Sequence, residues 1–177
     1  MKELETERLR LRKLRQDDVS KIYYGWANDA EVTKYLTWNP HESIDVTQQI
    51  LDMWLAAYQD EQTVRYGIEL KETAELMGMI DIVEYWDEFP VIGYALGKKY
   101  WNQGFMTEAC SVVTDYLFEL GYSKIFIEAE VENLGSNAVI AKNNFQLIKQ
   151  EVRPRSQFKE GMVKVNIYQK VNSNLLQ

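Results

Sequence analysis

The chain has 177 residues, 46% of them hydrophobic, and carries a formal net charge of −7. This length suits one domain with a full core, so we expect a single domain over residues 1–177. The acidic balance disfavours nucleic-acid binding, because phosphate contacts need clustered Lys and Arg. It either attracts cationic amines or simply keeps the protein soluble.

Cys110 is the single cysteine of the chain and His41 its single histidine. One cysteine forms no internal disulfide, which favours a reducing compartment, and one histidine forms no His pair for a metal site. The apolar runs are too short to cross a bilayer, and the charged N-terminus does not resemble a signal peptide. We therefore expect a cytoplasmic protein with no membrane partner and no metal.

The N-terminal part predicts one strand and two short helices. Leucines alternate with arginines over residues 9–14, which is typical of a half-buried strand with the arginines on its solvated face. Asp17 or Asp18 then provides an N-cap for an amphipathic helix over residues 19–26. A second helical piece is expected over residues 32–36.

A loop over residues 37–43 is punctuated by Pro40, and Ser43 is a candidate N-cap for a helix over residues 47–58. Alternating or continuous apolar residues then predict an antiparallel meander of three strands, over residues 64–70, 76–86 and 91–96. The expected turns between them are residues 71–74 and 87–90.

The C-terminal part begins with a helix over residues 105–120, followed by a strand over residues 125–131. Because a helix crosses between them, the strands 91–96 and 125–131 must be parallel. The chain then predicts a further helix and a closing hairpin, formed by residues 145–147 and 163–171 and joined by residues 153–161.

The junction from Tyr94 to Ala109 reads as a strand, a turn containing Gly104, and a helix. Free backbone N–H groups and the helix dipole at such a helix N-terminus attract anions, phosphate above all. Gly104 lacks a Cβ and so lets the backbone approach a ligand closely. Taken alone, this pattern is more typical of a glycine that serves packing.

A second stretch, from Asn133 to Phe145, adds to this signal. Together the two stretches resemble the GNAT family of acetyl-CoA-dependent N-acetyltransferases. Residues 101–106 match the family's pyrophosphate loop, Gln/Arg-x-x-Gly-x-Gly/Ala, although Trp101 and Met106 depart from it. The Rim-type branch, which acetylates ribosomal-protein N-termini, has a second pattern that is matched here by Asn133, Ser136, Val139, Lys142 and Phe145.

The resemblance implies an α+β GNAT fold, with a mixed, mostly antiparallel sheet of about seven strands. The sheet would splay at a central parallel pair and carry helices on both faces. The resemblance also implies acetyl-CoA as co-substrate, with its pyrophosphate on the turn and its pantetheine along the preceding strand. The cofactor-binding residues are then expected to be Tyr94, Ala95, Leu96, Trp101, Asn102, Gln103, Gly104, Phe105, Met106, Thr107, Asn133 and Lys142. Lys98, Lys99 and Lys142 either offset the cofactor's charge or are solvated.

Two catalytic residues are expected. Ser136, oriented by Asn133, would protonate the leaving thiolate, unless it merely caps its helix. Glu84 is the candidate general base, because a carboxyl among apolar residues has a raised pKa, unless it lies at the wet end of its strand and a water chain replaces it. Glu128 and Glu130 share one strand face and are expected to be solvated.

The resemblance also implies that the loop carrying Trp38 and His41 lines the acceptor channel. Both residues are therefore candidates for substrate binding, against a Trp that packs on the core and a His exposed to solvent.

We thus expect transfer of an acetyl group from acetyl-CoA to a primary amine, by direct attack in a ternary complex. The acceptor stays open between a ribosomal-protein N-terminus, a polyamine and an amine drug. The alternative is a non-catalytic acyl-CoA-binding sensor or partner-binding module, because no carboxylate directly precedes Val91 and the loop is altered. Eleven Tyr and five Trp permit a homodimer.

Overall fold

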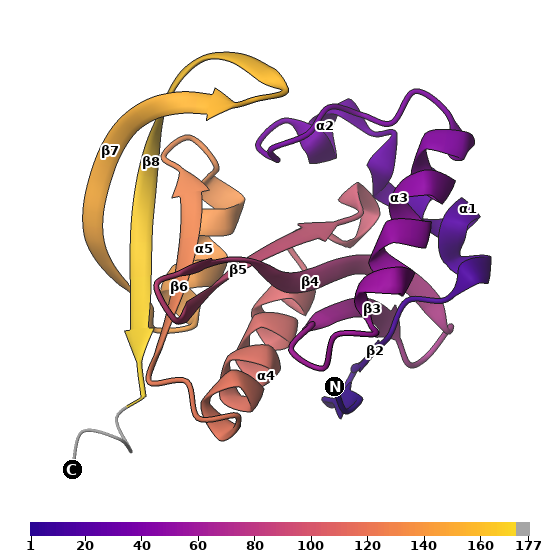
Figure 1. Ribbon diagram of the computed structural model, residues 1–177, viewed down its shortest axis with the longest axis horizontal. Helices are drawn as coiled ribbons and strands as arrows, with labels where there is room; N and C mark the ends of the chain where they lie inside the picture. Colours follow the sequence, from indigo (N-terminus) through magenta and orange to yellow (C-terminus); the bar gives the residue numbers. More distant parts are fainter. Residues whose placement is uncertain (173–177) are drawn as a thin grey trace.

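The computed structural model describes residues 1–172, and one curved sheet runs through the molecule (Figure 1). The strand order is β1-β2-β3-β4-β5-β6-β8-β7, which gives eight strands where about seven were expected. The short β1 accounts for the difference. The strands are β1 (Leu4–Glu5), β2 (Leu9–Arg12), β3 (Arg65–Leu70), β4 (Glu75–Trp86), β5 (Phe89–Leu96), β6 (Lys124–Glu130), β7 (Gln146–Ser156) and β8 (Lys159–Val171).

The sheet is antiparallel throughout its described part except between β5 and β6, as predicted. That parallel pairing covers only Val91 with Phe126 and Ile92 with Ile127. Beyond it, β5 stays paired with β4 and β6 stays paired with β8. The sheet therefore opens between the last residues of β5 and those of β6, and the expected splay is confirmed.

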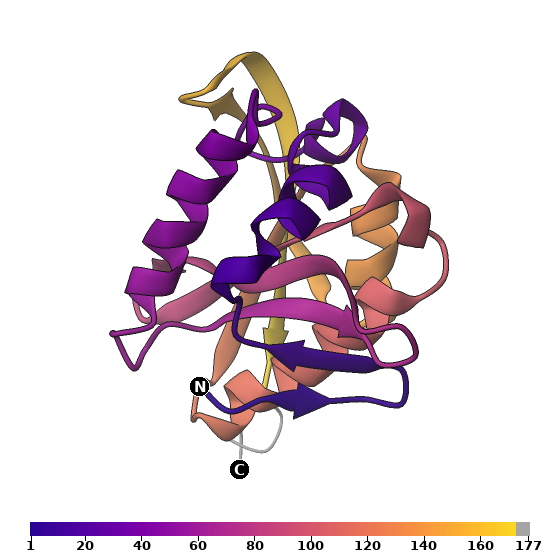
Figure 2. The same cartoon turned by 90° about the vertical axis from the view of Figure 1, so that its right-hand side faces the viewer.

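Helices cover both faces of the sheet, as the two perpendicular views show (Figures 1 and 2). On one face, which we call the α4 face, helices α4 (Phe105–Glu119) and α5 (Leu134–Lys142) pack on the sheet. The opposite α3 face carries the remaining helical elements, namely α1 (Val19–Ile22), a π-helical turn (Tyr23–Ala27), α2 (Ala30–Thr33) and α3 (Ile44–Ala57).

Apolar periodicity explains both layers. Phe105, Ala109, Val113 and Leu117 recur at helical spacing on α4 and are buried in one core cluster. On the α3 face, Trp26 and Leu51 are fully buried against sheet residues in a second cluster. Cys110 belongs to the α4 cluster, where burial raises the pKa of its thiol to about 12, so it is a core residue.

Two predicted turns are wrong in their extent. Asp87 adopts a left-handed φ of 56°, so Asp87 and Glu88 alone reverse the chain, and β5 already begins at Phe89. The expected connection over residues 153–161 is mostly strand. β7 continues to Ser156 and β8 starts at Lys159, and this hairpin arches over the end of the sheet towards α2 (Figure 1).

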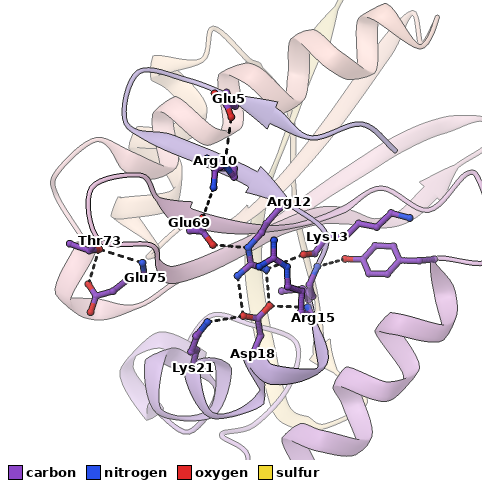
Figure 3. Close-up of polar contacts among 12 residues, drawn as sticks. Glu5, Arg10, Arg12, Lys13, Arg15, Asp18, Lys21, Glu69, Thr73 and Glu75 are labelled. Atoms are coloured by element: carbon purple, nitrogen blue, oxygen red, sulfur yellow. Dashed lines mark hydrogen bonds and ion pairs between the residues drawn. The ribbon is translucent and has the colours of Figure 1, made fainter.

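The arginines of β2 do not all lie on a solvated face. Arg12 is 1% exposed, and its three side-chain nitrogens donate to Asp18, Glu69 and a backbone carbonyl (Figure 3). Asp18 also accepts from the backbone N–H of Arg15, and its side chain makes no capping hydrogen bond to α1, contrary to the prediction. We call Arg12, Asp18 and Glu69 the Arg12 cluster.

Candidate active site

The turn between β5 and α4 has the geometry of an anion site. Asn102 and Gly104 both adopt left-handed conformations, with φ of 59° and 81°. Gly104 stands at the N-cap position of α4, and no side chain caps this 15-residue helix. Its first backbone N–H groups and its dipole are therefore available to an anion.

Arg8 brings a positive charge to this turn, a feature that sequence reasoning missed. Its guanidinium donates to the Gln103 carbonyl at 3.0 Å and to Glu108 at 2.7 Å, and lies over the Phe105 ring. A Cβ placed on Gly104 would lie 3.5 Å from Arg8 Nη2. Because 95 residues separate Arg8 from Gln103, no local pattern could reveal the contact.

A pocket of about 460 Å³ adjoins the turn between α4 and the end of α5. Three predicted cofactor residues meet there, since Gly104, Thr107 and Lys142 all line it. Asn143 holds the two helices together by donating to the Thr107 carbonyl. Lys98 and Lys99 instead form surface ion pairs with Glu31 and Glu75.

The remaining predicted cofactor residues divide between the turn and the core. Trp101 donates its indole N–H to the Leu96 carbonyl at 2.8 Å, and Gln103 donates to the Lys99 carbonyl. Both side chains thus brace the turn. Ala95, Leu96, Phe105 and Met106 are buried, so only their backbone groups can face a ligand.

Tyr94 and Ser136 meet beside the opening of the sheet. The Tyr94 hydroxyl lies 2.8 Å from Ser136 Oγ, across 42 residues of sequence. Asn133 caps α5 by accepting from the backbone N–H of Ser136, so the alternative that Ser136 caps its own helix is wrong. Burial raises the pKa of Tyr94, so its hydroxyl stays protonated and can hydrogen-bond to Ser136.

The predicted base Glu84 is not in an apolar setting. It lies on the exposed end of β4, next to an irregularity in the β4–β5 ladder. Its negative charge nevertheless acts on Glu128, whose pKa it helps to raise.

Glu128 and Glu130 are not solvated, contrary to expectation. Arg153 on β7 forms an ion pair with Glu128, and Arg155 donates to Glu130 at 2.9 Å. The Glu128 side chain is only 17% exposed, and burial raises its pKa although Arg153 opposes the shift. Within residues 1–172, Glu128 Oε1 and Arg155 Nε are buried without hydrogen-bond partners. We call these four residues the Arg153 cluster.

Trp38 and His41 stack on each other, with ring centroids 5.0 Å apart. Trp38 packs against the cluster of the α3 face, and His41 Nδ1 lies 2.8 Å from Thr47 Oγ1. Burial lowers the pKa of His41. His41 is thus half-buried and hydrogen-bonded, and Trp38 is partly covered, as a packed loop tryptophan would be.

The tip of the β7–β8 hairpin is fastened to the same loop. Ser156 donates to the Thr37 carbonyl, Asn39 donates to the Phe158 carbonyl, and Lys159 donates to the carbonyl of Lys34. These hydrogen bonds hold the hairpin, and with it Arg153 and Arg155, over the α3 face.

Comparison with known proteins now decides the family. An acetyltransferase (GNAT) domain matches residues 8–146. The chain belongs to the GNAT acetyltransferase family. YoaA of Bacillus subtilis, an uncharacterized N-acetyltransferase, is 33% identical over 94% of this chain and 88% of its own length.

Solved GNAT structures share the fold. RimL, a ribosomal L7/L12 alpha-N-protein acetyltransferase solved with coenzyme A, has a TM-score of 0.83 at 21% identity and covers 96% of this chain and 98% of its own. The microcin C7 self-immunity acetyltransferase MccE, in complex with acetyl-CoA and AMP, has a TM-score of 0.81 at 19% identity, with 94% of each chain covered. This GNAT protein is thus an acetyl-CoA-dependent acetyltransferase.

The opening in this GNAT sheet has different chemistry on its two faces. Side chains alternate along a strand, and Ile125, Ile127 and Ala129 pack in the α4 cluster, so Glu128 projects on the α3 face. Tyr94 packs against the α4 cluster instead. The hydroxyl pair and the Glu128 carboxylate therefore lie on opposite sides of the opening.

Residues 1–172 contain neither a metal-binding group of side chains nor a membrane-spanning helix. No group of three or more His, Cys, Asp or Glu side chains in residues 1–172 could hold a metal ion. None of the helices in that range is both long and apolar enough to span a bilayer.

Proposed function

We propose that this GNAT enzyme acetylates a protein N-terminus by direct attack of its α-amine on acetyl-CoA in a ternary complex. One observation carries the proposal, namely that the Tyr94–Ser136 hydroxyl pair and Glu128 flank the sheet opening from opposite faces. Acetyl transfer needs a base for the amine and an acid for the thiolate, and these groups supply both.

The turn and its neighbours would hold the co-substrate. The uncapped N-terminus of α4 receives phosphate, and Arg8 and Lys142 add positive charge at the turn and in the adjoining pocket. The backbone of Tyr94, Ala95 and Leu96 is the expected support for the pantetheine arm, through main-chain hydrogen bonds. When bound there, acetyl-CoA supplies the acetyl thioester.

Glu128 is the proposed base. The raised pKa of Glu128 is closer to the pKa of an amine than an ordinary carboxyl pKa is, and this favours proton transfer. Glu84, the base expected from the sequence, would act as a flanking charge that raises the pKa of Glu128.

Ser136 is the proposed acid, the Tyr94 hydroxyl holds it in place by a hydrogen bond, and solvent returns the proton to Ser136 after turnover. Donation to the leaving sulfur turns the thiolate into a thiol and prevents the back reaction. Trp38 and His41 would form a wall of the acceptor channel on the α3 face.

The choice of a protein N-terminus rests on chemistry and on likeness to RimL. An α-amine titrates at about 7.7–8.0, whereas a lysine or polyamine amine titrates near 10.4, so the α-amine needs less help from a base. RimL, whose fold this chain shares, acts on the N-terminus of L7/L12 according to its name. A polyamine is the second candidate, because the net charge of −7 on the chain attracts cations.

The test is thiol release from acetyl-CoA with peptides that begin with Ser or Ala, and with spermidine and an aminoglycoside. The matched control is each peptide with its N-terminus already acetylated. We expect faster turnover with free N-termini than with spermidine or the aminoglycoside, none with the blocked peptides, and a fall of at least about 100-fold in kcat for Glu128→Gln with unchanged acetyl-CoA binding. Binding of acetyl-CoA that Gly104→Asp abolishes, without turnover of any amine, would support the sensor alternative.

A further inference from the structure

We propose that Arg153 is a positioning residue that sets the charge selectivity of this enzyme, excluding protonated amines from Glu128 and so favouring acceptors that are partly neutral at working pH. The inference rests on the proposed role of Glu128 as base. It concerns a residue of the β7–β8 hairpin, far in sequence from the cofactor turn.

Arg153 lies on β7, and Glu128 lies on β6. β8 lies between β6 and β7 in the sheet, so the arginine side chain crosses a strand to reach Glu128. It also donates to Glu151 at 3.2 Å on its own strand. The hairpin tip, three residues further on at Ser156, is fastened to the Thr37 carbonyl. The contacts at Glu151 and at Ser156, on either side of Arg153 along β7, therefore fix its position.

Three charged side chains act on the Glu128 carboxylate. Glu84 faces it from β4, and Glu151 and Arg153 face it from β7. Its partner on β8 is the apolar Ile167, and β5 presents Val91 near the same level. Glu130 beside it is already neutralised by Arg155. Arg153 is therefore the cation that balances Glu128.

The Glu128–Arg153 ion pair would treat protonated and neutral amines differently. With Arg153 in place, a protonated amine meets a guanidinium that already occupies Glu128 Oε2, and like charges repel. A neutral amine meets no such penalty. Without Arg153, Glu128 and Glu84 would form an uncompensated negative pair that attracts cations, whereas Glu151 would keep Lys149 as its partner.

The inference predicts two linked changes for Arg153→Met. An opposite charge within about 4–6 Å lowers the pKa of a carboxyl by about 1–3. Because Arg153 is partly exposed, its loss should raise the pKa of Glu128 by the lower end of this range, and the acid limb of kcat/KM should move up by about one pH unit. The ratio of kcat/KM for an N-terminal peptide to that for spermidine should fall about tenfold, mainly through a lower KM for spermidine.

Two variants control this test. Arg153→Lys keeps the charge and should restore both the acid limb and the selectivity. Lys149→Met removes one positive charge from the same strand at a solvent-exposed ion pair with Glu151 and should leave both unchanged.

The experiment measures pH profiles and both kcat/KM values for the wild type and these variants, with folding checked by circular dichroism. Movement of limb and ratio in Arg153→Met, with rescue by Arg153→Lys, would support the inference. If neither moves while Glu128→Gln still lowers kcat at least 100-fold, the inference is wrong and the proposed function stands. If Glu128→Gln has no effect, the proposed function itself fails.

Discussion

Two clusters in this protein place an arginine between carboxylates, yet they differ in whether all their charged side-chain atoms have hydrogen-bond partners. In the Arg12 cluster, the three side-chain nitrogens of Arg12 donate, and both carboxylates accept at each oxygen (Figure 3). In the Arg153 cluster, Glu128 Oε1 and Arg155 Nε have no hydrogen-bond partner in the described range. Each charged side-chain atom of the first cluster has a hydrogen-bond partner, whereas two atoms of the second cluster have none within residues 1–172.

Burial follows the same division. Arg12 and Asp18 are 1% and 0% exposed, whereas Arg153 is 37% exposed. The Arg12 cluster joins β2, β3 and the start of α1, so it holds the α3 face to the sheet. A complete buried network specifies structure, and a partial network at a sheet opening marks the candidate site.

The largest expected effect is on stability, from Arg12→Met. Removal of this arginine leaves Asp18 and Glu69 as buried carboxylates without their main partner, which costs about 3–5 kcal/mol of unfolding free energy. Urea denaturation would measure it. Arg153→Met is the matched control and should cost less than about 1 kcal/mol, because that pair is partly exposed. Equal losses in the two variants would contradict the comparison.

The next effect is on activity, from Glu128→Gln. We expect kcat to fall by at least about 100-fold while the urea midpoint changes little. Glu69→Gln is the control from the other cluster, and it should lower the midpoint while the folded fraction keeps its kcat. A normal kcat in Glu128→Gln would remove the functional meaning of the Arg153 cluster.

A smaller effect is expected at the hydroxyl pair. Ser136→Ala alone should lower kcat only about tenfold, because the Tyr94 hydroxyl lies close enough to substitute through a water. The double variant Tyr94→Phe with Ser136→Ala should lose about 100-fold. We expect Tyr94→Phe alone to lower kcat much less than tenfold, because Ser136 remains. Single-turnover kinetics with an N-terminal Ser peptide would check all three variants, and about tenfold losses in both single variants, which multiply to about 100-fold, would argue against substitution.

The smallest effect concerns the pH dependence of stability. Burial would raise the pKa of Asp18, but Arg12 and the Arg15 N–H outweigh it and lower that pKa. The stabilisation by Asp18 is therefore full above its ordinary pKa of about 3.9 and is lost as the pH falls further. The pKa of Glu128 is raised, so its ionisation destabilises the fold as the pH rises.

The opposite pH dependences of the Asp18 and Glu128 contributions can be measured as changes in unfolding free energy between pH 3 and pH 6. Each change should be about 1 kcal/mol or less. The gap between wild type and Asp18→Asn should narrow as the pH falls. The stability of Glu128→Gln relative to wild type should grow as the pH rises through the pKa of Glu128. Parallel curves for both variants would contradict the assignment of the two carboxyls.

Local features of the fold could be predicted from the sequence because they depend on neighbours a few residues apart. Ser43 caps α3, and the apolar spacing of α4 appears in the structure as a buried stripe. Gly104 adopts the left-handed conformation that its place in the turn requires. The same reasoning failed at the hairpin, where residues 153–161 were expected to be a connection, because ion pairs and hydrogen bonds to distant residues extend both strands into this range.

The sequence by itself determined the order of the strands other than the short β1, the place of the glycine turn before α4 and the GNAT family, because short periodicities and a fixed motif spacing encode them. Only the tertiary structure decided which charges meet. Alternation along β2 and β6 tells which face Arg12 and Glu128 occupy, but not what covers that face. Their partners Glu69 and Arg153 lie 57 and 25 residues away, and Arg8 reaches Gln103 across 95 residues. Hydrogen bonds and charge pairs act over a few ångströms of space, so the chain must fold before they exist.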